Sequence, residues 1–161
     1  MLTITIDPSS EQVRAAFLAK GPQIVRAIVD KLNALMIRLQ AHIVSDKLSG
    51  QVLHHRTGTL ANSIRVIPAQ LQADKIVAGV EGAGGPAWYG RPNEFGAHIP
   101  ERVPVNARAL HWTSADGESV FAMRARAFDL PARSFMGSSL DDYRSIIPAE
   151  ISAAVTKAIT P

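Results

Sequence analysis

The sequence predicts an α+β fold in which a small antiparallel β-sheet packs against a long N-terminal amphipathic helix and a C-terminal helix. Three observations predict it. Apolar residues recur every three or four positions over residues 24–43, alternate with other residues in short segments between 60 and 130, and return to helical spacing over 140–155. Helices before and after a group of strands are typical of the α+β class.

The length and composition indicate a single globular domain. The chain has 161 residues, of which 47% are hydrophobic and 19% charged, and a chain of this length buries roughly 70% of its unfolded surface. We divide it into a helical segment over 10–49, a sheet with long loops over 57–130 and a C-terminal helix over 137–159. Because cysteine is absent, disulfides, thiolate metal sites and cysteine nucleophiles are excluded.

The charge and the apolar runs exclude several classes of partner. The net charge is +3, and the basic residues are spread along the chain, whereas a DNA-binding domain gathers them on one face. No apolar run approaches the roughly 20 residues of a membrane span. The first residues lack the basic start and apolar core of a signal peptide. We therefore expect a protein without a membrane association.

The N-terminal residues predict a short strand and then a helix. Apolar and threonine residues alternate over 2–6, as in a strand with one buried face. Ser9 and Gln12 have the spacing of a capping box, which predicts a first helix over about 10–19. Pro22 lacks a backbone N–H and crowds the preceding turn, so a kink or a stop is expected there.

The strongest structural signal is an amphipathic helix of about 26 residues, which would be about 39 Å long. It closes at Ser49-Gly50. A helix of that length outruns a small domain, so part of its apolar stripe is expected to pack on another subunit. His42 lies beside the stripe and is interpreted as a residue at the edge of the core. The stripe comprises Ile24, Ile28, Leu32, Leu35, Leu39 and Ile43.

Two hairpins are predicted in the middle of the chain. After a loop over 54–58, residues 60–67 lead into a strand that pairs with 75–80 across a turn at 68–74. Residues 110–112 and 118–128 pair through an Asp-Gly turn.

The remaining segments connect these elements. We expect a turn at 81–86, a long loop at 96–108 and an exit turn at 131–136, while 87–95 fits either a helix or a strand. A last helix begins at Ser139, and Pro148 should kink it. Its predicted apolar positions are Leu140, Tyr143, Ile147, Ile151 and Val155.

Motifs that would carry catalysis or bind a cofactor are weak. Residues 82–87 fit the G-x-G-x-x-A pattern, but Gly90 and Pro92 disfavour the helix that a phosphate-binding loop needs. Glu94 and His98 are four residues apart without a recognised metal-ligand spacing. We therefore expect no catalytic residue, no cofactor and no metal, and do not expect an enzyme.

Four segments, taken in order, resemble a known family. Residues 56–64 read R-T-G-T-L-A-N-S-I, Trp88-Tyr89 precedes N-E-F-G at 93–96, and 131–137 read P-A-R-S-F-M-G. These resemble the R-T-G-x-L-x-x-S-I, Y-x-x-x-x-E-F-G and P-A-R-P-F-L-G segments of tail-completion proteins from long-tailed phages. Residues 110–121 are similar to the virion-morphogenesis proteins of contractile-tailed phages. Ser134 departs from the family pattern, which usually has proline there.

The resemblance implies a structural virion protein rather than an enzyme. It implies a ring-forming, six-fold subunit of the neck or tail end, assembled in the host cytoplasm, that joins a finished tail to the DNA-filled head. The implied partners are further copies of the chain and neighbouring neck, tail-terminator or tail-tube proteins, and contact with DNA in the channel is left open. The structural and interface candidates are Arg56, Gly58, Leu60, Tyr89, Glu94, Phe95, Gly96, Arg133 and Phe135. Among them we interpret Phe95 as an anchoring ring, and we expect Arg133 to tie the last helix back by a charged hydrogen bond with Phe135 buried.

Two other functions remain as alternatives. A basic nucleic-acid-binding module would use Arg124, Arg126 and Arg133 to contact phosphates. An enzyme would act through Glu94 and His98.

Overall fold

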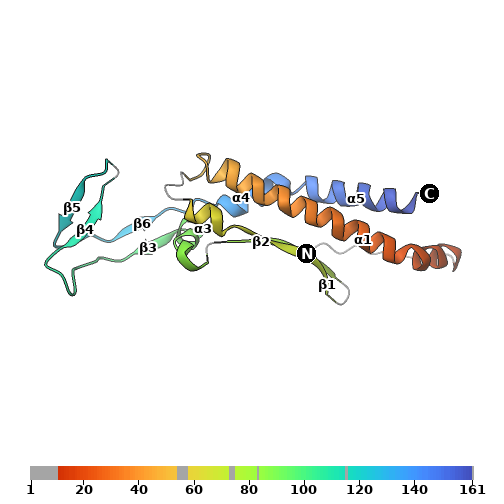
Figure 1. Cartoon of the computed structure of the whole chain (residues 1–161), viewed down its shortest axis with the longest axis horizontal. Coiled ribbons are helices and arrows are strands. Elements are labelled where there is room, and N and C mark those ends of the chain that lie inside the picture. The colour runs from red at the N-terminus through yellow and green to blue at the C-terminus, as the bar shows by residue number, and fades with distance from the viewer. Residues whose placement is uncertain (1–10, 54–57, 73–74, 83, 115, 161) are drawn as a thin grey trace.

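The chain forms an elongated α+β molecule, which confirms the predicted fold class (Figure 1). The computed structural model describes residues 11–53, 58–72, 75–82, 84–114 and 116–160. Two helices lie side by side along one part of the molecule, and a thin pair of β-ribbons extends away from the other end. The strand expected over 2–6 lies outside the described residues.

The first helix, α1 (Glu11–His42), is a continuous element of 32 residues and leads into a π-helical turn, η1 (Ile43–Lys47). Of the kink or stop expected at Pro22, the stop is wrong, since the proline lies inside the helix. A proline costs a helix one backbone hydrogen bond, but here helical turns on both sides and the packing of α1 on α5 and β1 offset that loss. The predicted apolar stripe is buried at Leu35, Leu39 and Ile43.

A first hairpin covers another face of α1. After the short helix α2 (Thr59–Ser63), strand β1 (Arg65–Gln72) pairs antiparallel with β2 (Lys75–Glu81). The turn predicted from residue 68 is wrong, because β1 continues through Pro68 to Gln72 with a register shift between Ile67 and Gln70. A proline is tolerated in a strand at such an irregularity, where no ladder hydrogen bond is needed.

The chain then turns through η2 (Gly85–Ala87) into a second short helix, α3 (Gly90–Phe95). Residues 87–95, which fitted either a helix or a strand, are therefore helical at their C-terminal end. The long loop predicted after it is partly wrong, since β3 (Ala97–Ile99) pairs antiparallel with β6 (Phe128–Leu130) and Arg102 forms a bridge with Ala125. A segment whose sequence is typical of a loop thus pairs with a strand about 30 residues further along the chain.

The second hairpin forms as predicted from the Asp-Gly turn. Strand β4 (Leu110–Thr113) pairs antiparallel with β5 (Ser119–Ala122), which ends six residues earlier than predicted. The described strands thus make three two-stranded sheets, β1-β2, β3-β6 and β4-β5, rather than one. We call residues 97–130, described apart from residue 115, the arm, and the rest of the described chain the body.

The C-terminal helix is divided in two. Helix α4 (Phe135–Tyr143) begins before the predicted start at Ser139, and α5 (Ile146–Ile159) follows after two turn residues. Pro148 does not kink a helix but lies in the first turn of α5, where a missing N–H costs no hydrogen bond. Leu140 is exposed instead of buried, whereas Tyr143, Ile147 and Ile151 pack against the core as predicted.

The hydrophobic core occupies only part of the body. Its buried apolar residues come from the end of α1 and the segments packed around it, namely Leu35, Met36, Leu39, Ile43, Leu48, Leu60, Ile64, Ala87 and Phe135. The accessible surface is 11,503 Å², whereas a compact chain of 17.3 kDa exposes about 7,800 Å². A single copy therefore exposes far more surface than a globular protein of its size.

Candidate functional site

Two of the segments that carry the family resemblance, residues 93–96 and 131–137, meet where the arm joins the body. Glu94, in α3, is 7% exposed, and its carboxylate faces the first turn of α4. Oε1 accepts hydrogen bonds from Ser134 Oγ at 2.7 Å and the Gly137 N–H at 2.9 Å, while Oε2 accepts one from the Met136 N–H at 2.9 Å. Free N–H groups and a partial positive charge at a helix start suit a carboxylate. Glu94 thus caps a helix 40 residues away in sequence.

Gly96 and Arg133 complete this junction through their backbones. Gly96 has φ 76° and ψ 163°, a conformation open in practice only to glycine. A Cβ there would lie 3.0 Å from the carbonyl oxygen of Leu130 and 3.1 Å from the nitrogen of Ala132. The N–H of Arg133 donates to the carbonyl of Asn93 at 2.6 Å. The chain therefore enters and leaves the arm at one tightly packed point.

The other predicted residues of the junction divide between core and surface. Phe135 is fully buried, as expected of it. Phe95 was interpreted as an anchoring ring, but it is 73% exposed, because the capping carboxylate of Glu94 takes the inward position beside it. The charged hydrogen bond expected from Arg133 is also wrong, since its side chain is exposed and the backbone makes the contact.

The first family-like segment lies at the core. Gly58 has φ 70° and precedes α2, and its carbonyl accepts the N–H of Asn62 at 2.8 Å. Leu60 is buried among the core residues. Tyr89 is half-buried, with its ring edge-on to Trp88 at a centroid distance of 6.4 Å. Arg56 lies outside the described residues.

An ionic cluster that was missed in the sequence ties α4 to the end of α1. His42 places Nδ1 2.6 Å from Asp46 and Nε2 3.0 Å from Asp142, and the buried Lys47 lies 2.7 Å from Asp142. Hydrogen bonds from Lys47 and then His42 lower the pKa of the Asp142 carboxyl. Bonds from Ser45 and His42 lower the pKa of Asp46. His42 thus lies at the core edge as expected, but with carboxylate partners.

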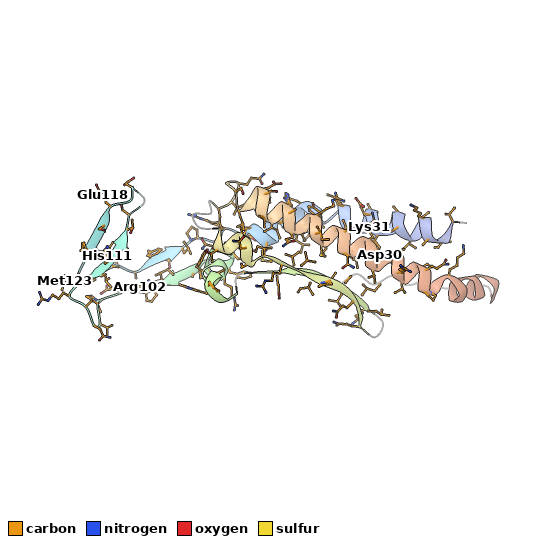
Figure 2. All side chains as sticks on the ribbon, viewed as in Figure 1. Asp30, Lys31, Arg102, His111, Glu118 and Met123 are labelled. Atoms are coloured by element: carbon orange, nitrogen blue, oxygen red, sulfur yellow. The ribbon has the colours of Figure 1, made fainter. Side chains whose placement is uncertain are left out.

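A second cluster ties α5 to α1. Glu150 accepts hydrogen bonds from Lys31 at 2.8 Å and Arg38 at 2.9 Å. These contacts, the Lys31 bond first, lower the pKa of the Glu150 carboxyl, and the same pairing raises the pKa of Arg38. Figure 2 shows Lys31 on α1 facing α5, next to Asp30. Both clusters join segments about 100 residues apart, so spacing in the sequence could not reveal them.

The arm carries apolar side chains that its own chain leaves uncovered. In the β4-β5 hairpin, cross-strand pairing puts Leu110, Trp112, Val120 and Ala122 on one face. Phe121 lies on the other face, stacked on His111 at 4.7 Å. In the β3-β6 ribbon, Ala97, Ile99, Phe128 and Leu130 share one face. Figure 2 shows His111, Glu118 and Met123 toward the free end of the arm.

Glu94, His98 and Arg124, which were considered for catalysis or phosphate binding, all contact other groups of the chain. His98 contacts Asp129 at 2.7 Å on the exposed face of the β3-β6 ribbon, while Glu94 caps α4. Arg124 lies 3.5 Å from Glu101. Among the described residues no group of three His, Asp or Glu side chains could hold a metal ion. A cleft of about 610 Å³ lies between Arg65, Glu81 and the 84–87 turn.

Comparisons with protein-family models, with curated proteins and with solved structures returned no match. Within the described part of the chain, no helix is long and apolar enough to cross a membrane.

Proposed function

We propose that this protein is a structural subunit of a phage neck or tail end. Copies of it form a six-fold ring of the tail-completion or connector type, which joins the tail to the DNA-filled head. The observation that carries the proposal is the exposed surface of a single copy, whose core fills one region while a long arm exposes apolar side chains. Exposed apolar side chains gathered on one part of a protein mark a site of contact with other molecules.

The family-like motifs support the same assignment. The segments at 93–96 and 131–137, which are separated by the arm, pack against each other through Glu94. Together they frame the base of the arm, so the residues that carry the resemblance form one structural unit. Each of these residues acts by capping, close packing or a backbone turn, and none of these roles needs a substrate.

The alternative of a nucleic-acid-binding module has less support. Arg124 already lies beside Glu101, and the arm that holds Arg124 and Arg126 contains equal numbers of arginine and acidic residues. A module bound to phosphates would lose affinity steeply as salt rises. Measurable DNA binding by the purified chain with that dependence would favour this alternative.

The proposal is tested on virus particles. Under it, purified virions of the phage that encodes the chain contain the protein in a small fixed copy number, measured by quantitative mass spectrometry. Deleting its gene yields filled heads and tails that lie unjoined, or tails of abnormal length, in electron micrographs. Normal infectious particles made without the protein, and its absence from wild-type particles, would refute the proposal.

A further inference from the structure

The arm is too thin to be stable by itself. It consists of two ribbons, β3-β6 and β4-β5, and each strand pairs with a single neighbour. Neither ribbon, as far as the described chain goes, is covered by a helix or a second sheet layer (Figure 1). An isolated two-stranded ribbon is marginally stable in water, and a hydrophobic face needs further strands or a helix packed against it.

Large exposed apolar side chains are spread along the arm. The exposed fractions are 55% for Val103, 88% for Val105, 68% for Phe121, 70% for Met123 and 56% for Phe128. Trp112 adds a further ring on the face opposite Phe121. Single exposed apolar residues are common, but several large ones gathered on one thin extension indicate an interaction surface.

The charges of the arm suit a second copy of the chain as its partner. Residues 97–130 contain four arginines, no lysine and four aspartates or glutamates, so their formal charge is zero. Two of these charges are already engaged in the pair between Arg124 and Glu101, and Asp129 is held by His98. The neutral arm can therefore pack on a neighbouring copy without net repulsion. Nucleic acid or a strongly charged protein would find no complementary field there.

The exposed area also fits contacts between copies. The chain exposes roughly 3,700 Å² more than a compact protein of its mass. A standard interface buries about 800 Å² on each partner, and obligate interfaces between identical chains bury more. A ring subunit has two such interfaces, and the exposed apolar side chains of the arm are part of this exposed area.

We propose that a second copy of this chain covers the arm, and that this contact is the main bond between neighbouring subunits. This inference depends on the proposed function only in assuming that the copies form a ring. The arm lies at the opposite end of the molecule from most of α1 and α5 (Figure 1), so it reaches outward rather than folding back on its own body. If the arm of one copy packs on a different surface of the next, the contact is head-to-tail, and it repeats from copy to copy and forms a ring when the rotation between copies closes.

The first test measures the mass of the purified full-length chain by light scattering and native mass spectrometry over a wide concentration range. We expect wild type to form a discrete oligomer, and Phe128→Asp and Val105→Asp to shift its dissociation constant at least 100-fold toward the monomer. Val105 is almost fully exposed, so its substitution leaves the monomer fold intact. Ile37→Asp is the matched control, because Ile37 is 59% exposed on α1. A wild-type monomer at all concentrations, or equal loss in the control, would overturn the proposal.

The second test identifies the occupant directly. A photo-reactive benzoylphenylalanine replaces Phe121, and ¹⁴N- and ¹⁵N-labelled chains are mixed before irradiation. We expect mixed-isotope cross-linked peptides, which arise only between two copies. Cross-links found within single chains alone, or only to a different protein in particles, would overturn the inference. If the arm holds oligomers together but the protein is missing from virions, the proposed function is refuted. This inference would then still stand.

Discussion

Glu94 has a structural role that an acidic residue beside a histidine at i+4 would not suggest. Both of its carboxylate oxygens are used, and all three donors belong to the start of α4. The N–H groups of a first helical turn have no partner inside the helix. A buried carboxylate satisfies them while itself being satisfied, which explains why an acidic side chain is stable in this position.

We expect Glu94→Gln to lower the free energy of unfolding by about 2 kcal/mol. An amide keeps one accepting oxygen but turns an NH₂ group toward a backbone or hydroxyl donor, so one hydrogen bond is replaced by a repulsive contact. Urea denaturation of the full chain measures this. Glu118→Gln, on the exposed hairpin of the arm, is the control and should change stability by less than about 0.5 kcal/mol. Equal effects in the two variants would contradict the capping role.

We expect Gly96→Ala to destabilise the chain by about 2 kcal/mol or more, because its φ of 76° is strained for alanine. The new Cβ would also press on the backbone of Leu130 and Ala132, which cannot move as a side chain can. Gly84→Ala is the matched control, since Gly84 has φ −92° and open space around it. Thermal unfolding by circular dichroism compares the two, and an unchanged midpoint in Gly96→Ala would contradict the argument.

At the scale of elements, prolines account for several of the differences between sequence and structure. Pro22 lies within a helix, Pro68 within a strand and Pro148 in a first helical turn. Local rules correctly state that proline removes a backbone N–H donor. They do not show how the surrounding fold offsets that loss. Packing of α1 on two partners, a register shift in β1 and the α4–α5 break decide these cases. The Asp-Gly hairpin and the long helix needed no such information and were predicted correctly.

Acid should loosen α5 from α1, because the pKa of Glu150 lies below its ordinary value of 4.5 in the folded chain. A carboxyl whose pKa is lowered by folding stabilises the fold above its unfolded pKa. That contribution disappears as the pH falls through the folded pKa. We therefore expect Glu150→Gln to be less stable than wild type at pH 7 and equally stable near pH 2. Melting temperatures across this range measure the difference.

The comparison between variants isolates Glu150 from other acid-sensitive groups. The pKa values of Asp46 and Asp142 are also lowered, so wild type and Glu150→Gln will both lose stability in acid. Hydrogen exchange in α5 provides the local readout. A difference between the two proteins that stays constant from pH 7 to pH 2 would contradict the role given to the ion pairs.

At the scale of the whole molecule, sequence patterns predicted the class but not the shape. The apolar stripes indicate which faces are buried, and the residues from Leu35 to Ile43 obey them. They do not indicate that the core stops there, or that residues 97–130 leave the body. Phe121 and Phe128 lie in the strand predicted over 118–128 but are exposed, because the periodicity of a strand does not tell whether its own chain covers a side chain. The capping of α4 by Glu94 was hidden for a related reason, since it depends on two distant segments meeting.

Because the proposed contact between copies is apolar and the arm is electrically neutral, the oligomer should withstand salt. We expect its dissociation constant to change by less than about threefold between 0.1 M and 1 M NaCl, a range over which the screening length falls from about 10 Å to 3 Å. Sedimentation velocity measures this, with Phe128→Asp as the dissociated reference. Complete dissociation at 1 M salt would show that charged groups outside the arm hold the copies together.

The pairing of Ala97 with Leu130 brings the two ends of a 34-residue excursion to adjacent positions. Such an arrangement is modular, since whatever lies between those ends can change in length or composition while Glu94 and Gly96 keep the helices in place. The reach and fit of this extension can thus change while the scaffold of the body stays the same. A graft of one extension onto another scaffold at these two positions would transfer assembly specificity with it.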